Sequence, residues 1–144
     1  MSDSSDLDRF VRAQETNYTQ ALSELRGGRK RTHWMWYVFP QLEGLGSSPT
    51  AVLYAISGLD EAESYLAHPV LGPRLVECAE AVLQHATLSA SEMLGYPDDM
   101  KLRSSATLFA RVSPAGSVFQ RILDTFFDGQ PDQTTLRLLQ TRPG

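Results

Sequence analysis

Apolar residues recur three and four positions apart along most of this chain, and glycines and prolines interrupt the pattern at short intervals. Such spacing gathers the apolar side chains on one face of a helix. No segment shows the alternation of apolar and polar residues that is typical of a half-buried strand. The sequence therefore predicts an all-α fold, in which short helices are stabilised by packing their apolar faces against one another.

Capping and stop signals indicate where these helices begin and end. Ser5 and Asp8 resemble a capping box at the start of a helix over about 6–26, which two glycines end. Asp98 is the predicted N-cap of a helix over about 99–112. Similar signals predict further helices over about 49–56, 59–67, 90–94, 114–127 and 131–140. Pro73 is predicted in the first turn of one more helix, which carries Leu75, Val76, Ala79, Val82 and Leu83.

Length and composition fit a single globular domain. The 144 residues are 42% hydrophobic and 21% charged, as in ordinary soluble proteins, and a chain of this length can bury a sizeable core. We expect one domain over residues 1–144, with about residues 1–5 as a flexible N-terminus. Its architecture should be a compact, irregular array of about seven or eight mostly short helices.

Charge and targeting signals exclude several classes of protein. The net charge of −4 argues against general attraction to nucleic acid or anionic lipid, although a local basic patch could hold one phosphate-sized group. The polar, acidic start MSDSSDLD is unlike a secretory signal, and no apolar run is long enough to span a membrane. Cys78 is the only cysteine, so no intramolecular disulfide can form. We expect a cytoplasmic protein that binds neither membranes nor specific nucleic acids.

Both tryptophans lie in RKRTHWMWYVFPQ, residues 29–41, beside three consecutive cations and a histidine. A buried aromatic ring removes roughly 150–250 Å² from water, so these rings anchor the core or line a pocket, and the core is the commoner role. His33 is likewise more often structural than catalytic, but its aromatic and cationic neighbours favour a role as a ligand-binding residue or a base. Residues 32–39 are apolar on every side, so their periodicity fits a buried helix and a strand equally well.

The second polar motif is PDDMKLRSSATLF, residues 97–109. On a helix, Lys101, Ser104 and Ser105 project together, while Arg103 lies on another side. Cations in the first helical turn are disfavoured by roughly 0.3–1 kcal/mol each, whereas an anion is favoured there. Free backbone N–H groups, Lys101 and the two serines could therefore bind a phosphate or carboxylate. In the alternative interpretation, the two aspartates already compensate the helix dipole and the cations are solvated.

No sequence motif indicates a cofactor or a metal. The chain lacks metal-ligand spacing, a P-loop, a dinucleotide-binding glycine motif and a nucleophile elbow. Cys78 falls in an apolar helix without a basic neighbour in sequence, which is typical of an inert buried thiol. We therefore predict no cofactor and no metal site.

The chain contains, in this order, the segments LDRFVRAQ, ALSELRGGRKRTHWMWYVFPQLEGLGSSP, YLAHPVLGPRLVEC and DDMKLRSSATLF. Together they closely resemble a bacterial and fungal family catalogued as domain of unknown function eighteen-ten, over nearly the whole chain. Some members carry the label calpastatin, which we regard as a misannotation. The resemblance implies a single-domain, almost entirely helical fold, and it makes Trp34 to Phe39 helical. It implies no reaction, so function has to be argued from the site.

The family pattern also draws together a set of residues that a core chosen for volume alone would seldom need: His33, Trp34, Trp36, Gln41, Lys101, Arg103, Ser104 and Ser105. The resemblance thus favours a shared pocket, with Trp34 or Trp36 as a stacking wall and Lys101 or Arg103 as the anion donor. An aromatic plane beside fixed cations suits a nucleotide-like or sugar-phosphate molecule.

Two functions from different classes follow. The first is binding of such an anionic small molecule, with or without its hydrolysis. In a hydrolytic reaction His33 would be the general base, with Asp99 as the alternative, and Lys101 or Arg103 would stabilise developing negative charge. The second is a non-catalytic interaction module, in which the tryptophans belong to the core and the loop 29–31 binds an acidic protein. Convergence of the family residues around one cavity would favour the first function, and an exposed loop far from Lys101 the second.

Overall fold

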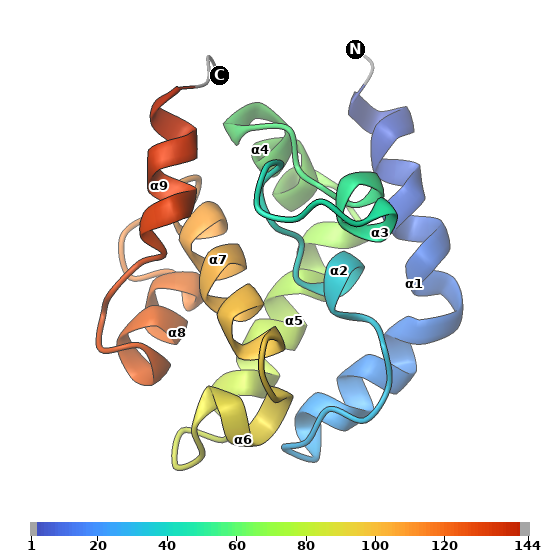
Figure 1. Ribbon diagram of the computed structural model, residues 1–144. Helices are drawn as coiled ribbons and strands as arrows, with labels where there is room; N and C mark the ends of the chain where they lie inside the picture. Colours follow the sequence, from blue (N-terminus) through green and yellow to red (C-terminus); the bar gives the residue numbers. More distant parts are fainter. Residues whose placement is uncertain (1–2, 142–144) are drawn as a thin grey trace.

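The computed structural model describes residues 3–141, and these form nine helices and no strand (Figure 1). The helices are α1 Asp3–Arg26, α2 Met35–Val38, α3 Pro49–Leu53, α4 Leu59–Ala67, α5 Leu71–Leu83, α6 Ala90–Leu94, α7 Asp98–Ala110, α8 Val118–Phe126 and α9 Gln133–Gln140. The predicted all-α array is confirmed. The number of helices exceeds eight because α2, α3 and α6 are short pieces of four or five residues.

The first helix begins earlier than predicted. α1 begins at Asp3 rather than near residue 6, so the predicted cap residue Ser5 lies within the helix. Neither glycine nor proline opposes a helix in this stretch. Residues 1 and 2 of the predicted flexible terminus lie outside the described residues, whereas residues 3–5 belong to α1. At the other end, Gly28 adopts a φ of 78°, the left-handed conformation with which glycine ends a helix.

Two helices, α5 and α7, each contact several others, and they share α4 and α8 as neighbours. α5 contacts α1, α4 and α8, whereas α7 contacts α8, α6, α9 and α4. In Figure 1, α1 and α9 form opposite edges of the molecule, and α2 lies between α1 and α7. The residues that carry both tryptophans therefore lie between α1 and α7.

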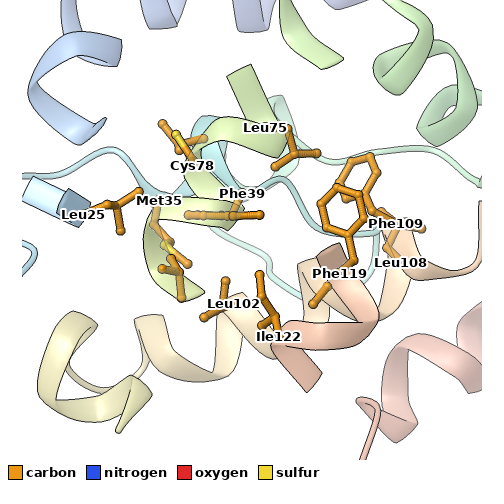
Figure 2. Packing of buried hydrophobic residues seen from close by; sticks show 14 of the residues in the cluster. Leu25, Met35, Phe39, Leu75, Cys78, Leu102, Leu108, Phe109, Phe119 and Ile122 are labelled. Carbon is orange, nitrogen blue, oxygen red and sulfur yellow. The ribbon is translucent and has the colours of Figure 1, made fainter. Parts of the chain in front are cut away.

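A continuous apolar core fills the space between the helices (Figure 2). Tyr65 of α4 is fully buried and meets Phe10 of α1 edge-on, with ring centroids 5.1 Å apart. It also packs against Phe109 of α7 at 5.4 Å, and Phe109 packs against Phe119 of α8 at 5.6 Å. Each aromatic pair of this kind adds about 0.5–1.5 kcal/mol to the energy of burial. A row of rings thus joins four helices.

Two predicted serine caps are confirmed. The Ser48 hydroxyl accepts the N–H of Ala51 at the start of α3. Ser89 and Glu92 form a complete capping box at the start of α6, in which each side chain accepts from the other residue's backbone. These caps satisfy N–H groups that the first turn of a helix leaves without partners.

Three other helix starts differ from the predicted ones. Ser117 and Asp132 cap α8 and α9 by accepting the N–H groups of Gln120 and Thr135, so these helices begin later than predicted. Asp98 is not a cap, because α7 begins at Asp98 itself and its N-cap position is occupied by Pro97. The carboxylate of Asp98 is bound by two lysines instead of by helix amides.

The tryptophan segment, residues 29–41, contains a single helical turn. This turn is α2, in which Met35 and Val38 are buried. Just beyond the segment, Leu42 pairs with Ile56 in an isolated parallel bridge, the one such pairing among residues 3–141. The helical interpretation of the ambiguous residues is therefore right for 35–38.

Candidate functional site

The tryptophan segment and the start of α7 line a cavity of about 260 Å³. Its lining combines cationic, acidic and aromatic side chains and consists of Lys30, His33, Trp34, Met35, Trp36, Tyr37, Thr50, Asp98 and Lys101. A larger open groove of about 900 Å³ lies between α5 and α8, but none of its lining residues belongs to either polar motif. The smaller cavity is therefore the candidate functional site.

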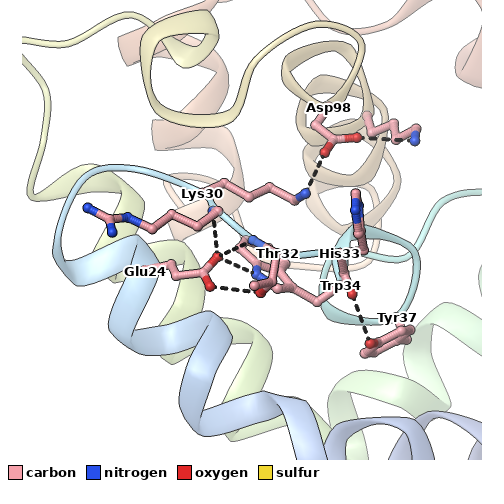
Figure 3. A network of polar contacts seen from close by, with 9 residues as sticks. Glu24, Lys30, Thr32, His33, Trp34, Tyr37 and Asp98 are labelled. Atoms are coloured by element: carbon pink, nitrogen blue, oxygen red, sulfur yellow. Dashed lines mark hydrogen bonds and ion pairs between the residues drawn. The ribbon is translucent and has the colours of Figure 1, made fainter.

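One carboxylate between two ammonium groups dominates the electrostatics of this cavity (Figure 3). Asp98 Oδ2 binds Lys30 Nζ at 2.9 Å, and Asp98 Oδ1 binds Lys101 Nζ at 3.1 Å. Each of the three side chains is at most 20% exposed. Two positive charges thus face one negative charge where water screens them weakly. With His33 neutral, the residues that line the cavity therefore carry one net positive charge.

These two residues are the only lysines in the chain, and the other eleven cationic side chains are arginines. An ammonium group is a compact charge with three donors, whereas a guanidinium is a planar fork. Each ammonium makes one ion pair with a residue in the described part of the chain, so both retain donors for a further acceptor. All the lysine of this protein is therefore concentrated in one site.

The two tryptophans have different roles. Trp34 is 1% exposed and belongs to the core, with Lys30 Nζ 5.2 Å from the centre of its ring. Trp36 is partly exposed, and Lys101 Nζ lies over its ring at 3.9 Å. A cation above an indole is attracted by about 0.5–1 kcal/mol at exposed sites and by more where it is desolvated. Trp36 therefore forms a wall of the cavity and positions Lys101.

A second carboxylate, from α1, holds the tryptophan segment on its other side (Figure 3). Glu24 Oε1 accepts the backbone N–H groups of Arg31 and Thr32 at 2.7 and 3.0 Å. The same oxygen accepts Trp34 Nε1–H at 2.8 Å. Glu24 Oε2 accepts the Thr32 hydroxyl at 2.7 Å and Gln20 Nε2 at 2.8 Å.

These bonds determine the charge of Glu24. Burial by itself raises the pKa of its carboxyl, but the five donors outweigh burial and lower that pKa to about 2. Glu24 is therefore ionised at neutral pH, with both oxygens occupied by neutral donors. Its role is to fix the backbone that leads into the cavity.

Two residues of α1 hold the backbone next to His33. Asn17 Nδ2 donates to the Tyr37 hydroxyl at 2.7 Å, and that hydroxyl donates to the His33 carbonyl at 3.2 Å. Gln14 Nε2 donates to the Tyr37 carbonyl at 2.7 Å. The His33 imidazole is exposed at the cavity and makes no hydrogen bond to any residue in the described range. Its backbone is thus held while its ring stays accessible to a ligand.

Four of the predicted site residues line the cavity, namely His33, Trp34, Trp36 and Lys101. Arg103 does not, because its Nε donates to the Gln130 carbonyl at 2.9 Å and its guanidinium lies near the Phe127 ring. Asp99 also lies outside the lining, and its Oδ1 accepts the N–H of Met100 at 2.8 Å. The helix thus directs these two charged side chains away from Lys101.

Three further predicted residues are buried in the fold. Ser104 and Ser105 are 6% and 1% exposed, and the Ser104 hydroxyl donates to the Met100 carbonyl one turn earlier. Gln41 is 7% exposed, and its Nε2 is the one buried side-chain nitrogen or oxygen without a partner among the described residues. None of the three lines the cavity. Their side chains are enclosed by neighbouring elements instead.

The first amides of α7 are already bonded. Asp99 N donates to the Gly95 carbonyl at 2.9 Å, and Met100 N and Lys101 N donate to the Pro97 carbonyl at 3.0 and 3.2 Å. The predicted anion site made of free helix amides, Lys101 and two serines therefore does not form. Of that set, only the lysine side chain lines the cavity.

Sequence reasoning missed two central residues of the cavity, Lys30 and Asp98. The sequence predicts Asp98 as a helix cap and Lys30 as part of a cationic loop. The composition contained a signal for Lys30, because the chain has only two lysines and one falls in each polar motif. Pairing these lysines would have directed attention to the acidic residue beside Lys101. Their neighbour Asp98 is the carboxylate that both ammonium groups bind.

Other classes of site find little support. Within residues 3–141, no group of three or more histidine, cysteine, aspartate or glutamate side chains could hold a metal ion. No helix of this range is long and apolar enough to cross a membrane. Cys78 is buried, and burial raises the pKa of its thiol to about 12. A protonated, buried thiol is a poor nucleophile.

Comparisons with known proteins match nearly the whole chain. A family profile described as "Protein of unknown function (DUF1810)" matches residues 4–139, which include both polar motifs. The crystal structure of the conserved hypothetical protein Rv1873 from Mycobacterium tuberculosis is similar, with 53% sequence identity and a TM-score of 0.92. That match covers 95% of this chain and 98% of the other. No curated protein matches the chain. The chain belongs to the DUF1810 family, and the resemblance seen in its sequence motifs is confirmed.

Proposed function

We propose that this protein binds a small anionic metabolite, of the sugar-phosphate or nucleotide-like class, in the cavity between α2 and α7. The observation that carries the proposal is the pair of largely buried ammonium groups, Lys30 and Lys101, which share the single carboxylate of Asp98. Taking cations out of water is unfavourable unless anions or acceptors replace the water. Asp98 compensates one of the two charges, and a bound anion would compensate the other.

The size of the cavity narrows the class of ligand. Its volume of about 260 Å³ is slightly below the roughly 300–1,000 Å³ of pockets that enclose drug-sized ligands. A sugar phosphate suits this volume, whereas a nucleotide would extend beyond it. Trp36 supplies an apolar surface beside Lys101, on which the apolar face of a sugar ring can pack. We therefore favour a sugar phosphate.

Hydrolysis of the ligand is a second candidate function, and the position of His33 favours it. His33 lines the same cavity as Lys101, and its accessible imidazole is suited to take a proton from an attacking water. As the water oxygen bonds to phosphorus and the ester P–O bond breaks, the two lysines would stabilise the developing negative charge, and the leaving oxygen would take up the proton that His33 had accepted. A phosphate-release assay tests this function. His33→Ala should abolish turnover while binding persists, and equal turnover in both proteins would exclude the role.

The competing function is a non-catalytic module that binds an acidic protein through the loop 29–31. Exposure of Arg29 and Arg31 favours it. Against it stands Lys30, which the same loop directs to Asp98 in the cavity. A module that binds an acidic protein surface needs its cations exposed, so enclosing Lys30 would weaken it. A small-molecule site, by contrast, needs an enclosed cation.

A thermal-shift screen of sugar phosphates and nucleotides tests the binding proposal. A ligand at 100 times its Kd adds about 2.7 kcal/mol of stability. Lys101→Ala should abolish the shift, whereas Arg103→Ala should preserve it, because Arg103 is a cation of the same helix that lies outside the cavity. If no anionic metabolite shifts the melting curve, or if both variants lose the shift equally, the proposed site is wrong.

A further inference from the structure

The loop that precedes the cavity carries a second positive surface. Arg29 and Arg31 are exposed on either side of Lys30 in the sequence. Within residues 3–141, neither guanidinium makes a hydrogen bond or an ion pair. The two arginines line one surface depression of about 470 Å³ together with Lys30, and another of about 270 Å³ together with Glu24. Two unpaired guanidinium groups thus lie close to each other outside the candidate site.

The backbone of this loop is fixed at each of its three residues. Arg29 N donates to the Glu24 carbonyl at 3.1 Å, and Arg31 N donates to Glu24 Oε1 at 2.7 Å. Between them, Lys30 N donates to the Met93 carbonyl at 2.7 Å. A fixed backbone lowers the entropy lost when the side chains bind a ligand. The backbone that carries the two arginines is therefore already ordered before a ligand binds.

Within residues 3–141, no carboxylate forms an ion pair with Arg29 or Arg31, although the ionised Glu24 offsets part of their charge from the depression that it shares with them. Glu24 lies beside them, but its two oxygens already accept five hydrogen bonds from other groups. Lys30 lines both the outer depression and the candidate cavity, so the two hollows adjoin on either side of one residue. The positive surface therefore continues from the cavity to the outside of the loop.

Resting on the proposed function, we infer that the ligand carries two separated phosphate groups, one bound by Lys30 and Lys101 in the cavity and the other by Arg29 and Arg31 outside it. The chemical class is a sugar bisphosphate. A guanidinium fork matches two phosphate oxygens, and two adjacent forks can hold one phosphate. The sugar would then lie beside Lys30, which borders both hollows. This division also suits the small cavity, which has to hold only one phosphate and its sugar.

Fructose 6-phosphate and fructose 1,6-bisphosphate form the probe pair, because they share a sugar and differ by one phosphate. Isothermal titration calorimetry at one pH and one ionic strength gives both dissociation constants. The wild-type protein should bind the bisphosphate at least about tenfold more tightly than the monophosphate, as one added charge-assisted contact predicts. Arg29→Ala combined with Arg31→Ala should remove this preference and leave the Kd of the monophosphate unchanged within about twofold.

Two further variants keep the test specific. Arg111→Ala combined with Arg121→Ala removes two exposed arginines elsewhere and changes the net charge equally, so the preference should persist. Lys101→Ala should weaken both ligands. A preference that the control pair also loses would assign the effect to net charge and overturn the inference.

The result also separates the inference from the proposed function. Equal affinities for the two sugars in the wild-type protein overturn the inference and leave the anion site standing. If neither sugar binds but the thermal-shift screen yields another anionic ligand, the assignment of the ligand as a sugar bisphosphate is wrong and the proposed anion site stands. Binding of neither sugar, with no ligand in the screen, overturns both.

Discussion

Two carboxylates hold the tryptophan segment from opposite sides, and their surroundings differ. Glu24 of α1 is 6% exposed and accepts five hydrogen bonds, none of them from a charged group. Asp98 of α7 binds two lysine ammonium groups at the edge of a cavity. A carboxylate saturated by neutral donors has no capacity left and stabilises structure. A carboxylate shared by two cations leaves positive charge for something else. Glu24 therefore has a structural role, and Asp98 belongs to the candidate site, although both contact the same short segment.

The largest expected effect comes from removing the scaffold carboxylate. Glu24→Ala leaves the buried Trp34 indole N–H and neighbouring N–H groups without their acceptor. Each buried unsatisfied group costs about 1–3 kcal/mol, so we expect a loss of about 3–5 kcal/mol. Urea unfolding measures it. Asp98→Ala should cost less, about 1–2 kcal/mol, because Asp98 and Lys101 remain 17% and 20% exposed at the cavity, where water can partly replace the lost ion pairs. Equal losses of unfolding free energy in the two variants would show that Glu24 and Asp98 do not differ in their structural roles.

Acid titration sharpens the same contrast. The pKa of Glu24 in the folded protein is about 2, below the ordinary value of 4.5. Its contribution to stability is therefore complete above pH 4.5 and is lost as the pH falls from there towards 2. The shift corresponds to about 3 kcal/mol. The difference in unfolding free energy between wild type and Glu24→Gln should accordingly shrink below pH 4.5. A difference independent of pH would show that the Glu24 charge is not stabilised by its donors.

Removing the charge of Asp98 should improve ligand binding, whereas removing the charge of Glu24 should only destabilise the fold. Asp98 occupies donors of both lysines that an anionic ligand needs. Asp98→Asn removes that competing charge and should therefore raise the affinity for fructose 6-phosphate about tenfold, or 1.4 kcal/mol. Calorimetry measures the change. Asp99→Asn is the matched control, with the same change of charge in the same turn but outside the cavity. Weaker binding by Asp98→Asn would mean that Asp98 orients the lysines rather than competing for them.

The helices were predictable from sequence because their signals are local. Ser48 and Ser89 cap helices through residues three positions away, and a helical wheel separates Arg103 from Lys101 before any packing is known. The role of Asp98 was not predictable in this way. Its side chain could have bonded to the amides of its own helix or to Lys30, which is far away in sequence. Only the packing of the tryptophan segment against α7 decides between them.

Burial was the other property that sequence could not supply. Ser104 and Ser105 share a side of the helix with Lys101, yet the long lysine side chain reaches the cavity whereas the short serines stay enclosed. Trp34 and Trp36 are two residues apart and both line the cavity, but Trp34 is 1% exposed and belongs to the core, whereas Trp36 stays partly exposed. Which of them is enclosed depends on neighbouring helices rather than on local pattern.

A smaller effect is expected where a loop packs against the cavity wall. A Cβ at Gly46 would lie 2.7 Å from the Ala51 Cβ and 3.3 Å from the Trp36 ring. Since Ala51 is anchored in α3, Gly46→Ala should displace the loop or the indole at a cost of about 1 kcal/mol. Urea unfolding and tryptophan fluorescence measure the change. Ser47→Ala, at the next residue, should alter neither. An unchanged fluorescence would mean that the loop does not position Trp36.

The smallest expected effect concerns the contact between Lys101 and Trp36 itself. The ammonium lies 3.9 Å above the indole, so a double-mutant cycle with Lys101→Met and Trp36→Leu should give a coupling energy of about 0.5–1 kcal/mol. Arg103 and Phe127, 5.7 Å apart, form a comparison cycle that should give less. Added fructose 6-phosphate should reduce the first coupling and leave the second unchanged, because a bound anion draws the Lys101 ammonium away from the ring. If the ligand leaves both coupling energies unchanged, Lys101 contacts the indole but does not bind the ligand. Asp98 and its two lysines would then have a structural role, like Glu24.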